Sequence, residues 1–305
     1  MNILISAYAC EPLKGSEPGV GWNLSVALSK KHNVTVITRL NNKKNIEKYL
    51  DENPIENLNF IYYDLPKSLI WIKKIIGVQV YYMLWNLLSI GVAKKWIKNH
   101  SVDLIHHITF NQYRTISFGY FINKPFVIGP IGGAELIDTT FDGELEYKTL
   151  KREKFRRKGS DINIIRFFNR LIDTKKCYIF SAKENQLRLS PKLENKKAIF
   201  HVLPSIGIDI KDFDIKENKI KGDDFIIIYA GRALDWKGLH LFLEALEKIK
   251  IDKTKIKVQL IGIRNKDEKL KTLGWINQYS LSNFVEVIDF MPRLDLLKIL
   301  EFANL

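Results

Sequence analysis

Cysteine is scarce in this chain of 305 residues, which contains only Cys10 and Cys177. The two lie far apart in the sequence, and neither stands near another thiol or a histidine at metal-ligand spacing. This scarcity excludes a disulfide-rich secreted scaffold and a thiolate metal centre. We therefore expect both cysteines to be reduced core residues of a cytoplasmic protein, and we assign no metal ligands.

A secretion signal is also lacking, because the first fifteen residues contain no basic segment followed by an apolar one. One long uncharged run does occur at residues 75–93, bracketed by lysine pairs at 73–74 and 94–95. It is long enough to span a bilayer, but a span would put neighbouring strands of one sheet on opposite sides of the membrane. We favour a buried crossover helix. The other alternative is a surface helix that presses Tyr81, Tyr82 and Trp85 toward lipid.

Acidic residues are too few to balance the basic ones, so the net charge is +14, and +9 of this excess falls in residues 151–210. That region opens with KREKFRRKG (151–159) and continues through Arg166, Arg170, Lys175 and Lys176. Such a density attracts anionic lipid, phosphorylated substrates or nucleic acid, whereas a solvated lysine-rich face is the plainer alternative. Because the aromatic residues do not interleave with the basic ones, we expect no nucleic acid but peripheral contact with an anionic membrane.

Short apolar runs alternate with longer stretches of helical spacing, which is typical of parallel strands covered by helices on both faces. The runs lie at 3–8, 34–39, 60–65, 103–109, 125–130, 177–182 and 198–204, then at 225–231, 257–262 and 285–290. We predict an α/β protein with two tandem doubly wound Rossmann-like domains, at 1–210 and 211–305. The second domain is expected to be incomplete, because three strands make half a sheet and the helix at 294–305 should lead into another strand.

A glycine-rich turn, GSEPGVGW (15–22), follows the first predicted strand. As a dinucleotide fingerprint it is weak, since the pattern lacks the third glycine and the next strand ends in Arg39 rather than an acidic residue. Two interpretations remain open. The glycines make a tight turn without a ligand, or the amides of Gly19 and Gly21 face an anion or a sugar at the positive end of a helix.

A second turn, AGRALDWKGL (230–239), follows the strand at 225–231. Gly231 lets the chain turn at the carboxyl end of the strand, where open α/β sheets bind ligands, and Gly238 opens the next helix. Arg232 and Lys237 suit a diphosphate at this edge. A surface ion pair between Lys237 and Asp235 explains the lysine equally well.

The pattern G-R-x(4)-K-G in this position resembles the donor site of glycosyltransferase family 4. Five further stretches agree in order: GSEPGVGW, DLIHHITF (103–110), GPIGGAE (129–135), LPSIGID (203–209) and QLIGIRN (259–265). Together the six motifs extend over essentially the whole chain. The resemblance implies a GT-B type fold with an N-terminal acceptor-side domain and a C-terminal domain that binds a nucleotide sugar. It also implies a retaining, hexosyltransferase-type enzyme that moves a sugar to a glycan or lipid-linked acceptor in envelope polysaccharide or lipopolysaccharide assembly.

The same resemblance implies roles for individual residues. Arg232 and Lys237 would neutralise the departing nucleoside diphosphate without a metal or other cofactor, and either His106 or His107 would lie near the transferred sugar. The remaining implied site residues are glycines and acidic residues: Gly19, Gly21, Gly231 and Gly262 on the donor side, and Glu17, Gly132, Gly133 and Glu135 on the acceptor side. Independently of the resemblance, adjacent residues of a strand point to opposite faces, so one of the two histidines is expected to be structural.

The sequence departs from the family pattern near its end. Family members carry two glutamates eight positions apart after a later strand, and this chain ends before that region. Two alternatives to a glycosyltransferase therefore stay open: a shortened, non-catalytic homologue that acts as a binding protein, and a nucleotide-sugar epimerase of the same fold.

Overall fold

The computed structural model describes residues 1–66, 72–114, 117–159, 175–193, 198–207, 225–249, 255–263 and 265–304. Contacts divide the chain into two compact units. Unit 1 consists of Met1–Leu136 and Phe155–Gly207, and unit 2 of Ile137–Lys154 and Ile208–Leu305. The expected domain boundary near residue 210 lies outside the described residues.

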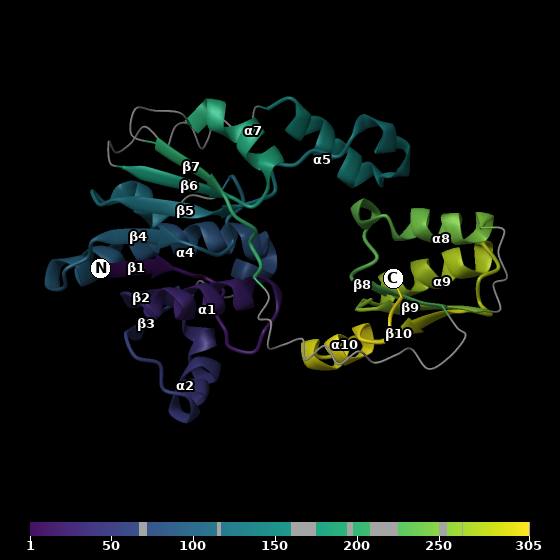
Figure 1. The fold of residues 1–305 in the computed structure, drawn as a ribbon. Coiled ribbons are helices and arrows are strands. Elements are labelled where there is room, and N and C mark those ends of the chain that lie inside the picture. The colour runs from purple at the N-terminus through teal and green to yellow at the C-terminus, as the bar shows by residue number, and fades with distance from the viewer. Residues whose placement is uncertain are drawn as a thin grey trace. The chain divides into compact units, whose positions relative to one another are not determined.

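Unit 1 is built on a sheet of seven parallel strands in the order β3-β2-β1-β4-β5-β6-β7 (Figure 1). The strands are β1 (Asn2–Ser6), β2 (Asn33–Arg39), β3 (Leu58–Tyr63), β4 (Leu104–His107), β5 (Phe126–Ile131), β6 (Lys176–Phe180) and β7 (Ala198–Val202). Each coincides with one of the apolar runs of the sequence, which confirms the predicted α/β class. The strand order reverses between β1 and β4, and this reversal is where doubly wound sheets bind their ligands.

Helices cover both faces of this sheet. They are α1 (Ser16–Ser29), α2 (Lys43–Glu52), α4 (Ile72–Asn99) and α7 (Lys183–Leu193), with short 3₁₀ turns at Leu40–Asn42 and Phe118–Phe121. Side chains of β1 alternate between two cores: Ile5 packs in the core that contains Trp22 of α1, and Leu4 packs in the core that contains Trp85 of α4. Burial on both faces explains why the strands are apolar throughout rather than alternating.

Helix α4 contains the long uncharged run of the sequence. Tyr81, Tyr82 and Trp85 are buried in the core of unit 1, so the alternative in which these aromatic residues press toward lipid is wrong, because they face the sheet. The buried crossover helix is confirmed for this side of α4. Within the described part of the chain, no helix combines the length and the apolar character needed to cross a membrane.

Unit 2 contains three parallel strands in the order β10-β9-β8 (Figure 1). Its strands are β8 (Phe225–Ala230), β9 (Ile256–Ile261) and β10 (Val285–Ile288), and its helices are α8 (Leu239–Lys248), α9 (Lys266–Gln278) and α10 (Arg293–Leu300), with a 3₁₀ turn at Asp235–Lys237. Leu239 and Leu243 of α8 pack with Leu260 of β9 in a separate core. The 3₁₀ turn Thr139–Glu144 and the first part of α5 (Tyr147–Arg157) also belong to this unit.

The basic region at 151–176 is not a uniform surface. Arg156 and Lys176 are buried, and the Arg152 guanidinium lies 4.8 Å above the ring of Trp236. Lys151, Lys154 and Lys158 are exposed, while Arg166 and Arg170 lie outside the described residues. Neither the expected contact with anionic lipid nor the alternative of a solvated lysine-rich face therefore holds for Arg156 and Lys176, which are buried within the protein.

Candidate functional site

The glycines of the first turn lie against the protein's own backbone. A Cβ at Gly19 would stand 2.2 Å from the carbonyl oxygen of Lys14, and a Cβ at Gly21 would stand 2.2 Å from that of Ala9. Both glycines are buried. Close packing between α1 and the preceding loop is thus sufficient to require glycine at both positions.

Helix α1 begins at Ser16, with Gly15 as its N-cap. In an α-helix the amide of residue i bonds to the carbonyl of residue i−4, so only the first four amides remain available to a ligand. Gly21 lies beyond them, inside the second turn. Of the two interpretations, the one that places the amides of Gly19 and Gly21 at the open end of the helix is wrong, because the amides there belong to Gly15, Ser16 and Glu17. Contact of the two glycines with a donor stays a prediction.

Glu17 ties the glycine turn to the loop after β4. Its Oε2 accepts a hydrogen bond of 2.9 Å from the backbone N–H of Phe110, a residue with φ of 57°. The N–H of Ala9 donates to Thr109 Oγ1 at 3.2 Å in the same region. The loops that follow β1 and β4 are therefore held together at the carboxyl edge where the strand order reverses.

His106 and His107 end β4 on opposite faces of the sheet. His106 is the register partner of Ile5, on the α1 face, and His107 is the partner of Ser6. The His107 ring forms a hydrogen bond of 2.8 Å through Nε2 with the hydroxyl of Tyr82 on α4. The expectation that the pair divides between two faces is confirmed.

Both histidine rings are neutral at physiological pH. Burial lowers the pKa of His106 to about 4, and burial together with the neighbouring His106 lowers that of His107 to about 3. His106 Nε2 lies 3.1 Å from the carbonyl oxygen of Gly129. Since a carbonyl only accepts, Nε2 carries the ring proton and Nδ1 is left as an acceptor. Neither ring can act as a general acid near pH 7, but His106 can accept a hydrogen bond from a hydroxyl.

The loop after β5 contains the predicted acceptor-side residues Gly132, Gly133 and Glu135. Gly132 donates its N–H to the carbonyl of Asn111 at 2.9 Å, which joins this loop to the one after β4. Asn185 of α7 is buried, and its side chain donates to Glu135 Oε1 at 2.5 Å and accepts from the Ala134 N–H at 2.8 Å. The structure thus brings Glu17, His106 and the 132–135 loop to one connected edge of unit 1.

Three residues that hold this loop have no signal in the sequence. Asn185 is separated from Glu135 by fifty positions. Arg156 donates to the carbonyl oxygens of Gly133 at 2.6 Å and of Glu135 at 2.5 Å, and Arg188 donates to that of Ala134 at 2.7 Å. Their roles follow from contacts between distant segments, which no local spacing reveals.

In unit 2 the two predicted donor-side glycines lie side by side. The N–H of Gly231 donates to the carbonyl of Ile261 at 2.8 Å, and a Cβ at Gly262 would stand 3.5 Å from the Gly231 backbone. Gly262 has φ of 95°, a conformation that L side chains rarely adopt. Two adjoining residues at the carboxyl ends of β8 and β9 therefore lack a side chain, which leaves room for a ligand to approach the backbone.

Arg232 follows directly and is paired with Glu268 of α9. Arg232 Nη2 lies 2.5 Å and Nε 3.2 Å from Glu268 Oε1. The arginine side chain is 55% exposed and the glutamate side chain 9% exposed. Glu268 was missed by the sequence reasoning, although Asn265-x-x-Glu268 fits a capping box. That signal predicts a bond between Glu268 and the helix N-cap, where the structure has a long contact of 3.4 Å from Asn265 Nδ2 to Glu268 Oε1, and it does not predict the pairing with Arg232.

Lys237 is exposed at the end of the 3₁₀ turn. The alternative of an ion pair between Lys237 and Asp235 does not occur among the described contacts, because the buried Asp235 carboxylate accepts the Glu146 N–H at 2.9 Å instead. Gly238 caps α8 with φ of 71°. The described part of the chain thus leaves the Lys237 ammonium directed at no protein carboxylate.

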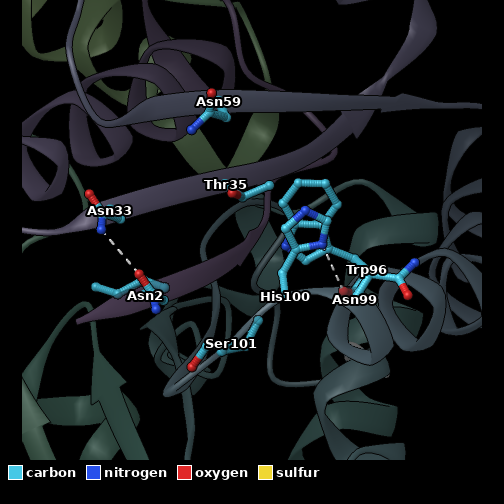
Figure 2. Close-up of a pocket in the computed structure, with 10 residues that line it drawn as sticks. Asn2, Asn33, Thr35, Asn59, Trp96, Asn99, His100 and Ser101 are labelled. Carbon is cyan, nitrogen blue, oxygen red and sulfur yellow. Dashed lines mark hydrogen bonds between the residues drawn. The ribbon is translucent and has the colours of Figure 1, made fainter.

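A hollow of about 420 Å³ lies at the opposite edge of the unit 1 sheet (Figure 2). Asn2, Asn33 and Asn59 line it from the amino ends of three strands, next to Trp96 and His100, whose rings stack at 3.5 Å. None of the predicted site residues lines this hollow. Ligands of doubly wound sheets bind at carboxyl ends of strands, so the edges described above remain the candidate site. Among the described residues no group of His, Cys, Asp and Glu could hold a metal.

Comparison with known proteins finds similarity to one family. Residues 210–305 match the family described as glycosyl transferases group 1. The protein named "Putative colanic acid biosynthesis glycosyltransferase WcaL" of Salmonella typhimurium is 28% identical over 99 residues, which cover 32% of this chain and 24% of that relative. The match thus spans about a quarter of the relative's length.

Solved structures resemble the chain over nearly its whole length. Anabaena Alr3699/HepE, solved in complex with UDP and glucose, is 14% identical with a TM-score of 0.56. The match covers 100% of this chain and 72% of the Alr3699/HepE chain. WaaG, a glycosyltransferase involved in lipopolysaccharide biosynthesis, is 14% identical with a TM-score of 0.53 and coverage of 99% and 73%. At such identities the likeness shows the fold.

Proposed function

We propose that this chain, which belongs to the glycosyl transferases group 1 family (glycosyltransferase family 4) and has a GT-B fold, is a retaining glycosyltransferase. Its donor would be a nucleoside-diphosphate sugar, of the hexosyl type. Its acceptor would be a glycan or a lipid-linked glycan of an envelope polysaccharide. The observation that carries the proposal is the arrangement of Gly231, Arg232 and Gly262 at the adjoining carboxyl ends of β8 and β9.

This arrangement suits a diphosphate leaving group. The two glycines let a ligand approach the backbone, and Arg232 offers an exposed guanidinium at the same edge. Lys237 adds an exposed positive charge from the following turn. As the glycosidic bond breaks, negative charge develops on the diphosphate oxygen, and a positioned cation stabilises it. The complex of Alr3699/HepE with UDP and glucose supports a uridine nucleotide as the first ligand to test.

For the sugar contact we choose His106 over His107. The His107 ring forms a hydrogen bond with Tyr82 inside the core, whereas His106 lies opposite Ile5 on the α1 face of the sheet and keeps Nδ1 as an acceptor. A His106→Ala variant is expected to lose affinity for a nucleotide sugar but not for UDP alone. His107→Gln is expected to lower the stability of unit 1 and leave both affinities unchanged. The reverse pattern would contradict the choice.

On the acceptor side, we assign Glu17, Gly132, Gly133 and Glu135 to the rim that meets the acceptor. The Glu135 carboxylate is oriented by Asn185, and Gly133 has φ of 79°, which a side chain at this position would strain. Asn185→Ala should therefore weaken acceptor use while UDP binding stays at the wild-type value.

The test of the donor site is calorimetric titration with UDP, followed by nucleotide release from a panel of UDP-, GDP- and ADP-sugars. Arg232→Ala and Lys237→Ala should each bind UDP at least about tenfold more weakly and lower turnover by about 10²- to 10³-fold. Lys248→Ala is the matched control, because Lys248 is exposed on α8 and pairs with Glu244. UDP affinity that is unchanged in both site variants would refute the donor site. Conversion of the sugar without any acceptor would instead support an epimerase.

We also propose peripheral attachment of the protein to anionic membrane, with α4 as the contact. Val80, Met83, Leu87 and Leu88 are 37–46% exposed on this helix, and Lys94, Lys95 and Lys98 are exposed toward its end. Their spacing of three and four residues places apolar and basic side chains along one side. Such a helix inserts apolar groups at the interface while its lysines meet lipid phosphates.

Liposome co-sedimentation tests this attachment. Binding should require anionic lipid, weaken with salt, and fall in the Leu87→Glu, Leu88→Glu double variant. Leu270→Glu is the control, since Leu270 is exposed on α9 of unit 2. Binding that does not depend on lipid charge, or a double variant that binds as well as the wild type, would contradict the proposal that α4 is the contact.

A further inference from the structure

Glu268 holds the guanidinium of Arg232 by one specific edge. The Nε and Nη2 atoms both point to the single oxygen Oε1, at 3.2 Å and 2.5 Å. A guanidinium has five N–H donors in a rigid, planar fork. When Nε and Nη2 face the glutamate, the end formed by Nη1 and Nη2 points away from it. This free end is the one that can pair with two phosphate oxygens.

The glutamate is itself firmly placed. Its N–H donates to the Asn265 side chain at 3.0 Å, and its carbonyl accepts the Thr272 hydroxyl at 2.8 Å. It sits in the first turn of α9, where the helix dipole favours a negative charge. Its side chain is 9% exposed, whereas the Arg232 side chain is 55% exposed. The buried partner therefore sets the position of the exposed one.

One feature separates this carboxylate from an ordinary helix cap. Its second oxygen, Oε2, is buried and has no hydrogen-bond partner among the described residues. A buried acceptor without a donor costs free energy, and capping of α9 is already supplied by Asn265. Oε1 also accepts a long hydrogen bond of 3.4 Å from Asn265 Nδ2, but its shortest contact is the one with Arg232.

We infer that Glu268 is a positioning residue for Arg232, which it holds by the Nε–Nη2 edge so that the Nη1–Nη2 end is presented to the diphosphate of the donor. The inference rests on the proposed donor site. Before binding, a long exposed arginine samples many rotamers, and their loss on binding weakens affinity. Glu268 removes part of this loss in advance.

The experiment is calorimetric titration with UDP of the wild type and of the single variants Glu268→Ala, Glu268→Gln, Arg232→Ala and Lys237→Ala. Two double variants, Arg232→Ala, Glu268→Ala and Lys237→Ala, Glu268→Ala, complete the set. Glu268→Ala should bind UDP about tenfold more weakly. Glu268→Gln retains Oε1 as an acceptor and should recover part of the loss. In the Arg232→Ala background, Glu268→Ala should not weaken UDP binding further. In the Lys237→Ala background, Glu268→Ala should weaken UDP binding by the same factor as in the wild type, because only Arg232 depends on Glu268.

A readout without ligand is the exchange of the Arg232 Nε proton with water, measured by NMR and assigned by its loss in Arg232→Ala. It should be slow in the wild type and fast in Glu268→Ala. Thermal unfolding shows whether each variant is folded. If Glu268→Ala is not folded, Glu268→Gln is the variant that tests the positioning role.

The outcomes separate the two proposals. A wild type that does not bind UDP refutes the donor site and the inference with it. A wild type that binds, an Arg232→Ala that binds weakly and Glu268 variants that bind like the wild type refute only the positioning role. Tighter binding by the Glu268 variants also refutes it, since Glu268 would then compete with the phosphates.

Discussion

The two neutral histidines predict a steep loss of stability for unit 1 in mild acid. In the folded chain the pKa values of His106 and His107 are about 4 and about 3, below the ordinary value of 6.5. Above pH 6.5 both rings are neutral in the folded and unfolded states and contribute no pH dependence. Below pH 6.5 the unfolded chain binds two protons that the folded chain does not, so falling pH favours unfolding.

The magnitude follows from these values. Each proton bound only by the unfolded state lowers the free energy of unfolding by about 1.36 kcal/mol per pH unit. Between pH 7 and pH 5 the loss is about 2 kcal/mol for each histidine and about 4 kcal/mol for the pair. Since a domain is stable by only about 5–15 kcal/mol, a loss of this size is readily measured.

The assay is urea unfolding at half-unit pH steps, followed by tryptophan fluorescence. Replacing Trp236 and Trp275 with Phe removes the described tryptophans of unit 2, so that the signal reports on unit 1. Below pH 6.5, the free energy of unfolding of His106→Gln and of His107→Gln should each fall with pH about half as steeply as that of the wild type, whatever their stability at pH 7. A wild-type loss below about 1 kcal/mol between pH 7 and pH 5, or slopes unchanged in both variants, would refute the reasoning.

Two further predictions concern the carboxyl edge and core of unit 1. Asp64→Ala should lower the free energy of unfolding by about 3–5 kcal/mol, because it removes the carboxylate that lies 2.8 Å from the largely buried Arg39 guanidinium. Glu47→Ala is the control: it removes the exposed ion pair with Lys43 on α2 and should cost less than about 0.5 kcal/mol. Equal losses of stability in urea titration would contradict the prediction. Gly21→Ala should lose about 1–3 kcal/mol because its Cβ would lie 2.2 Å from a backbone oxygen, whereas Gly91→Ala, which has open space in α4, should be neutral or gain up to about 1 kcal/mol. Thermal unfolding of both glycine variants measures this difference, and a neutral Gly21→Ala would show that the loop yields freely.

The strands and the α/β class could be predicted because their signal is local. A parallel strand buried on both faces must be apolar along its length, so runs such as 34–39 and 225–231 indicate strands without knowledge of their partners. The two motifs at 15–22 and 230–239 were found for a similar reason, since a turn at the end of a strand requires particular residues at neighbouring positions.

The candidate site was predicted only in part. The sequence placed Arg232 and Gly231 at a strand end and divided His106 and His107 between two faces. It did not reveal Glu268, because the contact with Arg232 joins residues thirty-six positions apart and the local pattern indicates a helix cap. The alternative of a surface helix also assigned the exposed side of α4 to the wrong residues. Apolar residues occur on every side of this helix, so the sequence pattern does not indicate which side faces the core.

Residue order alone determined which segments become strands and helices, and which short motifs stand at the strand ends, because these depend on neighbours along the chain. Only the tertiary structure decided which histidine turns toward α1, which carboxylate holds Arg232, and that the glycines of the first turn meet the protein's own backbone. Those outcomes depend on distances between segments that are remote in sequence. Such distances are settled when the sheet and its covering helices pack, and no local pattern contains them.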